Sequence, residues 1–368
     1  MCDSNIGTAT NMKTQVLIGF LLVCATAGLP LNNASEKTPQ NYDLCTKSDG
    51  VMCVYDDDEN LVRLRLDDDD EEDNTDLTDI ENFVFFLLYT RKNPLRSKPL
   101  YVDDEDALKR TKFDPALPTR FVTHGWMNSR KSAACTLIRD AYLKHGDYNI
   151  IVIDWSKISI KGYIWASNRV KRVGEFVSRM IDFLSKHQME LSETIVVGHS
   201  LGAHVAGIAA RNAKGEVKSV IGLDPALPRF ELVGPGSRIS SDDAEYVEII
   251  HTNGGFLGFL SAIGDADFYP NGGKKQHGCL TDPGGACSHA RSFRFFAESI
   301  TSTLGFHGRS CSSYRKFKRG RCNDSPTSIM GGHKSLFIAR GKYYLKTKSK
   351  FPFAKGPFEK FRRLNSTI

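Results

Sequence analysis

The sequence has 368 residues, 10% of them aromatic, and a formal net charge of +6. This length allows one large core, with or without a small second domain, and no stretch is long and apolar enough to span a bilayer. The positive charge does not indicate nucleic-acid binding, because the chain has no recognition motif and its start indicates export.

Residues 1–28 have the features of a signal peptide. Lys13 supplies a positive charge, residues 16–23 form an apolar run, and Ala25-Thr26-Ala27 is a small-residue cleavage pattern. We therefore expect the protein to be secreted. Asn-x-Ser/Thr triplets compatible with glycosylation begin at Asn33, Asn323 and Asn365.

Seven cysteines follow residue 28, namely Cys45, Cys53, Cys135, Cys279, Cys287, Cys311 and Cys322. In an oxidising compartment they should pair, and the odd number leaves one unpaired. Cys279 with Cys287, and Cys311 with Cys322, are close enough in sequence to close small loops. Cys135 is then expected to pair with Cys45 or with Cys53, and the sequence does not distinguish these two possibilities.

Charge is distributed unevenly along the chain. Residues 43–81 hold sixteen acidic and three basic residues, whereas residues 301–368 hold sixteen basic and two acidic residues. We expect residues 29–80 to be an acidic segment that is a propeptide or disordered, and residues 351–368 to be a basic tail. Both charged regions could be solvated surface, and the basic one could also attract anionic lipid headgroups.

Strands and helices are predicted to alternate from residue 82 onward. Apolar and β-branched runs predict strands at 82–89, 120–123, 149–155, 194–197, 217–223 and 246–250. Helices are predicted at 132–145, 168–187 and 203–210, and apolar residues recur at helical spacing over 293–300. This order predicts an α/β fold with a mostly parallel sheet covered by helices on both faces.

The chemistry starts from the segment 194–211, which reads T-I-V-V-G-H-S-L-G-A-H-V-A-G-I-A-A-R. It contains G-x-S-x-G between a buried strand and a helix of small residues, and that context is typical of a nucleophile elbow. Glycines are needed on both sides of Ser200 because the turn is strained and a Cβ atom would clash. We therefore expect Ser200 to be the nucleophile of an α/β-hydrolase fold.

A serine nucleophile needs a base, and the base needs a carboxylate that orients it. Asp224 is the leading acid, because it ends the strand at 217–223 and catalytic groups gather at the carboxyl ends of strands. The other acids considered are Asp242, Asp243, Asp265 and Asp267. The later histidines are His251, His277, His289, His307 and His333. The residues alone favour His289, in a loop before a helix, and leave His251 as its main competitor.

An oxyanion hole requires two backbone N–H donors. Leu201, which follows the nucleophile, is predicted to supply one. The other is expected from the loop after an early strand, where Trp126 is the candidate and Gly125 lets the backbone approach. We interpret His124 as a structural residue that holds this loop.

These residues resemble the pancreatic-lipase superfamily, and specifically its secreted arthropod phospholipase A1 branch. The similarity covers roughly residues 80–345, at 83–94 (F-V-F-F-L-L-Y-T-R-K-N-P), 123–126, 152–155, 197–207, 222–228, 267–273 (D-F-Y-P-N-G-G) and 287–300. The resemblance implies a catalytic domain at 81–350, a triad of Ser200, Asp224 and His289, and an oxyanion hole of Trp126 and Leu201. It also implies the Cys311–Cys322 disulfide.

Two short surface segments carry most of the substrate information. Pancreatic triacylglycerol lipases have a long lid between the two cysteines before the catalytic histidine, whereas Cys279 and Cys287 here enclose seven residues. The stretch 252–268 is also shorter than in lipases. Short versions of both are what phospholipases A1 of this family have, so the resemblance implies hydrolysis of the sn-1 ester of phospholipids.

The resemblance also bears on cofactors and partners. Pro235 and Ser240 stand where some lipases have acidic calcium ligands, so no metal or other cofactor is expected. The colipase-binding β-sandwich domain is missing, so we expect a monomer without colipase that acts on lipid at a membrane, micelle or lipoprotein surface. The alternatives are a triacylglycerol or galactolipid lipase of the same fold and a non-catalytic, yolk-type lipid-binding protein.

Overall fold

The structure, a computed structural model, describes residues 50–65, 78–334 and 337–358. All of them belong to one compact unit. The predicted signal peptide, Cys45, Asn33 and Asn365 lie outside these residues, as do most of the acidic segment and the last ten residues of the tail. Asn323 lies within them and is exposed.

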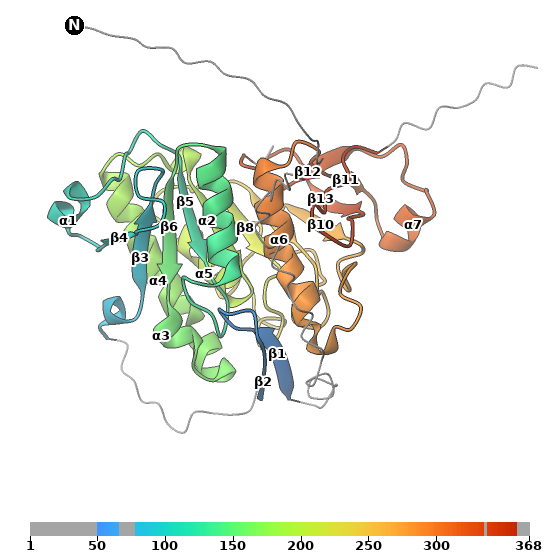
Figure 1. The fold of residues 1–368 in the computed structure, drawn as a ribbon, viewed down its shortest axis with the longest axis horizontal. Helices are drawn as coiled ribbons and strands as arrows, with labels where there is room; N and C mark the ends of the chain where they lie inside the picture. Colours follow the sequence, from blue (N-terminus) through green and yellow to red (C-terminus); the bar gives the residue numbers. More distant parts are fainter. Residues whose placement is uncertain (1–49, 66–77, 335–336, 359–368) are drawn as a thin grey trace, which may run out of the picture. The chain divides into compact units, whose positions relative to one another are not determined.

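The unit is built on an eleven-stranded sheet (Figure 1). Its strands are β3 (Phe85–Tyr89), β4 (Lys98–Leu100), β5 (Thr119–Thr123), β6 (Asn149–Asp154), β7 (Ile195–His199), β8 (Ser219–Leu223), β9 (Val247–Ile250), β10 (Ala266–Pro270), β11 (Phe306–Ser310), β12 (Thr327–Met330) and β13 (Gly341–Leu345). They lie in the order β12-β11-β13-β10-β9-β8-β7-β5-β6-β3-β4. The run from β13 to β6 is parallel, and the strands beyond it on both sides pair antiparallel.

Helices cover both faces of this sheet. They are α1 (Glu105–Lys109), α2 (Ala133–His145), α3 (Ser156–Ser159), α4 (Tyr163–Lys186), α5 (Leu201–Asn212), α6 (Ala286–Thr301) and α7 (Tyr314–Lys318). Alternate strand residues enter different cores: Phe86 and Leu88 pack with α4 and α5, whereas Leu87 and Tyr89 pack with α2 and α6. The central strands β5 to β9 are buried along their whole length and are mainly apolar, because helices cover both faces of the sheet there.

The strands and helices predicted between residues 82 and 300 are all present, with ends that differ by a few residues. The exception is α6, which begins at Ala286 and so extends seven residues further toward the N-terminus than the apolar run at 293–300. Ser132, the first residue of one predicted helix, is the N-cap of α2 and accepts a hydrogen bond from the Cys135 backbone N–H. The strands β4 and β10–β13 and the helices α1, α3 and α7 were not predicted from the sequence.

The hairpin of β1 (Val51–Tyr55) and β2 (Leu61–Arg65) was also not predicted, and it corrects the expectation that this part of the acidic segment is a propeptide or disordered. The two strands pair antiparallel from Val51 with Arg65 to Tyr55 with Leu61. Met52 and Val54 are buried in the core that contains α4 and α5. The dense acidic residues around these two short β-prone runs concealed a hairpin pattern.

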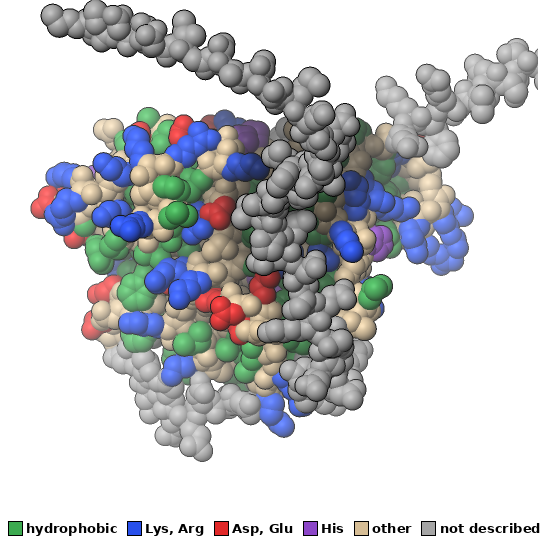
Figure 2. All heavy atoms as spheres, in the orientation of Figure 1, with side chains coloured by type: hydrophobic (Ala, Val, Ile, Leu, Met, Phe, Trp, Pro, Cys, Tyr) green, Lys and Arg blue, Asp and Glu red, His purple; other side chains and the backbone are tan. Residues whose placement is uncertain are grey.

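The acidic and basic regions of the sequence appear as separate charged areas on the surface. Figure 2 shows Lys and Arg side chains gathered over α7, where Arg315, Lys316 and Lys318 follow one another within a turn and a half. Acidic side chains gather where the turn of the β1–β2 hairpin lies in Figure 1. Within the described ranges, no helix has the length and apolar character needed to cross a bilayer.

The disulfide predictions are confirmed at two pairs and wrong at the third. Cys279 is bonded to Cys287, and Cys311 to Cys322. Cys135, which was expected to pair with Cys45 or Cys53, is a free thiol buried between α2 and the sheet. Cys53 is disulfide-bonded, so it is Cys135 that lacks a bond. Its burial in an apolar core is a sufficient role for a small hydrophobic side chain.

We expect Cys135 to be chemically inert in the folded protein. Burial raises the pKa of its thiol to about 12, so the reactive thiolate is scarce at neutral pH. Iodoacetamide at pH 8 should therefore leave Cys135 unlabelled in the native protein and label it after unfolding in guanidinium without reductant, as read by peptide mass spectrometry. A disulfide-linked peptide containing Cys135, or labelling of the native protein, would contradict this assignment.

Candidate active site

Ser200 lies on the turn between β7, at the centre of the sheet, and α5. Its backbone is strained, with φ 57° and ψ −123°, as a nucleophile elbow requires. A Cβ atom on Gly198 would lie 2.1 Å from the carbonyl oxygen of Gly202, so the turn can close only with glycine there. The backbone N–H of Ser200 donates to the Leu223 carbonyl at 3.1 Å, which ties the turn to β8.

Asp224 follows β8 directly and is fully buried. Its Oδ1 atom accepts backbone hydrogen bonds from Thr252 at 2.7 Å and Asn253 at 2.9 Å. Its Oδ2 atom contacts Nδ1 of His289 at 2.6 Å. A buried carboxylate needs such donors, and here they also hold the carboxylate in the orientation that receives the His289 N–H.

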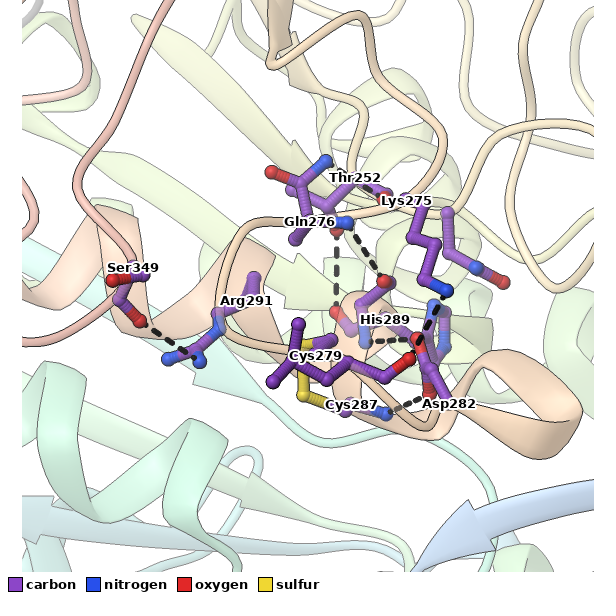
Figure 3. The surroundings of a disulfide bond; sticks show 12 residues. Thr252, Lys275, Gln276, Cys279, Asp282, Cys287, His289, Arg291 and Ser349 are labelled. Carbon is purple, nitrogen blue, oxygen red and sulfur yellow. Dashed lines mark hydrogen bonds between the residues drawn. A yellow bond between two sulfur atoms is a disulfide. The ribbon is translucent and has the colours of Figure 1, made fainter.

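His289 lies in the first turns of α6, not in the preceding loop where it was expected. Figure 3 shows how this helix start is held beside the Cys279–Cys287 disulfide. The carboxylate of Asp282 accepts the backbone N–H groups of Cys287 at 2.9 Å and Ser288 at 3.0 Å, which caps the helix. The disulfide and this cap together fix the position of the imidazole.

The competing histidine, His251, is used elsewhere. Its ring nitrogens contact the Phe259 carbonyl at 2.6 Å and Asp267 at 2.8 Å, and its ring stacks on Tyr269. His289–Asp224 is therefore one of three buried His–Asp pairs among the described residues, the others being His251–Asp267 and His124–Asp154. Of these three histidines, only His289 is among the residues that line the cavity around Ser200.

The remaining candidates have structural contacts. Asp243 accepts from Arg211 at 2.6 Å, Asp242 pairs with the same arginine, and Asp265 accepts the Val247 backbone N–H. His277 and His307 contact backbone carbonyl groups, and His333 stacks on His145. Within the residues that the structure describes, no group of three or more His, Cys, Asp or Glu side chains could hold a metal ion.

The predicted oxyanion donors lie beside Ser200. A Cβ atom on Gly125 would lie 2.8 Å from the Cβ of Ser200, so the loop after β5 approaches the nucleophile as closely as backbone can. Leu201 is the first residue of α5, where backbone N–H groups have no partner within the helix. Neither the Leu201 nor the Trp126 backbone N–H has an acceptor among the described residues.

His124 holds this loop. Its Nε2 atom accepts the Trp155 backbone N–H at 3.2 Å, and its carbonyl accepts the Trp155 indole N–H at 3.1 Å. Burial by itself would raise the pKa of Asp154, but the contacts with His124 and Ser156 outweigh it and hold that pKa below its usual range. These contacts fit the structural interpretation of His124.

The cavity around Ser200 and His289 is narrow, with a volume of about 30 Å³. That is room for about two water molecules. Small side chains of α2 and α6 line it, together with Trp126 and Phe293. The β1–β2 hairpin closes its remaining side with Val54, Tyr55, Asp56 and Glu59.

Sequence reasoning missed the hairpin and also His199, the residue before the nucleophile. The His199 ring lies 4.5 Å from the ring of His289, and neither of its nitrogens has a hydrogen-bond partner among the described residues. Burial and the neighbouring His289 lower its pKa well below the usual value, so the imidazole is neutral. Its position inside the G-x-S-x-G motif was the only available signal.

Comparison with known proteins gives one family. Residues 49–353 match the family model described as "Lipase". The chain is 33% identical over 301 residues to "Inactive pancreatic lipase-related protein 1" of Canis lupus familiaris, which covers 73% of this chain and 64% of that protein. It is 33% identical over 304 residues to "Pancreatic triacylglycerol lipase" of Cavia porcellus, covering 74% and 65% respectively.

A third relative is "Pancreatic lipase-related protein 2" of Rattus norvegicus, at 34% identity over 264 residues, covering 66% of this chain and 56% of that protein. The chain thus spans less than two thirds of the length of these curated relatives. The region that matches the family model contains the whole eleven-stranded sheet and the residues predicted to form the triad and the oxyanion hole. The chain has the α/β-hydrolase fold and belongs to the lipase family.

Proposed function

We propose that this protein is a secreted serine esterase that hydrolyses the sn-1 acyl ester of glycerophospholipids, as a phospholipase A1. The short segment between the bonded Cys279 and Cys287 is the main support. Its seven residues, 280–286, include the single 3-10 turn Pro283–Gly285, which is too short for an amphipathic lid helix. A short segment in place of a lid helix would remove apolar surface beside His289 and so favour a substrate with a charged headgroup.

In the proposed mechanism, Ser200 attacks the sn-1 ester carbonyl while His289 takes the hydroxyl proton. Asp224 accepts the Nδ1–H of His289, which leaves Nε2 unprotonated to act as the base and stabilises the imidazolium that forms. The backbone N–H groups of Trp126 and Leu201 donate to the oxyanion of the tetrahedral intermediate. When this intermediate collapses, His289 returns the proton to the leaving glycerol oxygen, and a lysophospholipid departs.

The acyl group then remains as an ester on Ser200. A water molecule loses a proton to His289 and attacks the acyl carbonyl through the same oxyanion hole. Collapse of the second intermediate releases the fatty acid and returns the proton from His289 to Ser200. The proposed steps use Ser200, His289, Asp224 and the two backbone donors of this chain, together with the lipid ester and water.

A triacylglycerol lipase is the second candidate, because one relative carries that name at 33% identity. Galactolipids are a further substrate of the same type. A non-catalytic, lipid-binding protein is the third candidate, because another relative, at the same identity, has the word inactive in its name. The presence of Ser200, Asp224 and His289 supports catalysis in this chain.

The same proposal covers location and partners. The two disulfides support an oxidising, extracellular setting. The substrate would be lipid at a membrane, micelle or lipoprotein surface, and we expect a monomer that works without colipase.

The proposal is tested with phosphatidylcholine labelled differently in its two acyl chains. We expect release of the sn-1 chain and accumulation of 2-acyl lysophosphatidylcholine, measured by chromatography in parallel with triolein as the competing substrate. Faster cleavage of triolein would favour the triacylglycerol lipase. Release of the sn-2 chain, or of neither chain, would exclude phospholipase A1 activity.

A further inference from the structure

The turn that joins β1 to β2 is strongly acidic and well ordered. It consists of Asp56, Asp57, Asp58, Glu59 and Asn60. The Asp56 carboxylate organises the turn, because its Oδ1 atom accepts the backbone N–H groups of Asp58 at 3.0 Å and Asn60 at 2.8 Å. The turn is therefore a preformed element rather than a loose loop.

Two further contacts attach the acidic turn to the body of the enzyme. The Asp57 carboxylate accepts the Ser129 backbone N–H at 2.8 Å and also the Ser129 hydroxyl. Glu59 forms an ion pair with Arg294 of α6. Among the residues the structure describes, Arg294 is the one cation that pairs with these four carboxylates, so the turn keeps an excess of negative charge.

This turn borders the cavity that contains the nucleophile. Tyr55, Asp56 and Glu59 line the same cavity as Ser200 and His289. The Glu59 side chain is 51% exposed and so is accessible to a bound molecule. A substrate whose ester reaches Ser200 therefore brings the groups next to that ester close to the acidic turn.

An independent observation indicates that polar parts of a substrate bind here. His199 is only 6% exposed and lines this cavity. Neither of its ring nitrogens has a hydrogen-bond partner within the described residues. A buried polar group without a partner lowers stability, and a substrate donor or acceptor would offset this loss on binding. The cavity thus presents an unpaired imidazole next to Ser200 and carboxylates at its hairpin side.

We propose that the acidic turn is a headgroup subsite that selects phospholipids with a cationic ammonium group over phospholipids with an anionic headgroup. This inference rests on the proposed phospholipase function and names its substrate class. The carboxylates of Asp56 and Glu59 attract a choline or ethanolamine ammonium, and the Tyr55 ring adds an aromatic surface to the same wall. A phosphatidylglycerol headgroup has no cationic group, so no attraction balances the repulsion between its phosphate and the carboxylates of the turn.

The test compares phosphatidylcholine with phosphatidylglycerol, each dilute in the same non-ionic detergent micelles. Dilution in a neutral micelle removes the attraction of the basic surface to anionic lipid, so only recognition in the site remains. The readout is the ratio of kcat/KM for the two lipids within one enzyme preparation. Because both rates come from the same preparation, any loss of folded protein cancels in the ratio.

Three variants test the direction in which the kcat/KM ratio changes. Asp56→Asn combined with Glu59→Gln keeps the acceptor oxygen that the turn needs but removes two charges and releases Arg294. It should lower the phosphatidylcholine preference about tenfold. Arg294→Gln removes the cation that neutralises Glu59 and should raise the preference. Asp106→Asn is the matched control, because Asp106 is an exposed carboxylate on α1, which contributes nothing to the cavity lining.

The outcomes are distinguishable. A lowered ratio in the double variant, with an unchanged ratio in Asp106→Asn, supports the headgroup subsite. Wild-type enzyme that cleaves both lipids with a ratio unaffected by the double variant overturns this inference and leaves the phospholipase proposal standing. Wild-type enzyme that cleaves neither lipid but hydrolyses triolein overturns both.

Discussion

Replacing Ser200 with alanine is expected to reduce kcat for ester hydrolysis by about 10⁶-fold. The change removes the only oxygen that can form the acyl-enzyme and leaves the strained elbow backbone in place. Hydrolysis of a short p-nitrophenyl ester and of phosphatidylcholine should fall together, because both depend on the same nucleophile. The measurement is a steady-state rate at equal concentrations of folded enzyme.

Ser178→Ala is the matched control. The Ser178 hydroxyl donates to the Glu175 carbonyl within α4, and neither residue lines the cavity around Ser200. We expect this variant to keep the wild-type rate. Ester hydrolysis that survives in Ser200→Ala would remove the serine esterase proposal as a whole, whichever lipid is the substrate.

Replacing Asp224 with asparagine is expected to lower kcat by about 10⁴-fold with much of the fold retained. The amide cannot serve as an anionic acceptor for Nδ1–H of His289, so the imidazole loses the tautomer and orientation that its role as base requires. The amide would also weaken the backbone hydrogen bonds from Thr252 and Asn253, so we expect a lower melting temperature as well.

Asp267→Asn separates catalysis from stability, because Asp267 forms a buried pair with the competing histidine, His251. It contacts His251 at 2.8 Å and accepts the Ile263 backbone N–H at 2.9 Å. We expect this variant to be destabilised while its folded fraction keeps most of its kcat, as measured with active-site titration. A loss of kcat in Asp267→Asn that matched the loss in Asp224→Asn would return His251 to consideration as the base.

Much of the scaffold could be predicted because its signals are local. Buried parallel strands are continuous apolar runs. The G-x-S-x-G turn needs glycine at Gly198, because a Cβ atom there would lie 2.1 Å from the Gly202 carbonyl oxygen. The order of strand, elbow and helix therefore follows from neighbouring residues. The strands β10 to β13 escaped prediction because their sequences mix polar, charged or glycine residues with apolar ones. Their place in the sheet therefore depends on pairing with distant strands.

The cysteines illustrate the opposite case. Close sequence spacing was sufficient for Cys279–Cys287 and Cys311–Cys322, since short loops bring their ends together. The pairing of Cys135 was inferred by elimination, and elimination fails when a cysteine is simply buried among apolar side chains. The hairpin at Val51–Arg65 was missed for a related reason, because its composition is dominated by surface charge while its burial depends on α4, α5 and α6.

The sequence by itself determined the α/β architecture and the position of Ser200 on its elbow, because both depend on hydrophobic periodicity and on backbone sterics within a few residues. Only the tertiary structure decided which aspartate meets which histidine. Asp224 and His289 are 65 residues apart and meet at 2.6 Å, whereas His251 is taken by Asp267. It also brought the acidic turn of the hairpin to the edge of the cavity. Such contacts depend on how separate strands and helices pack, and no local pattern encodes them.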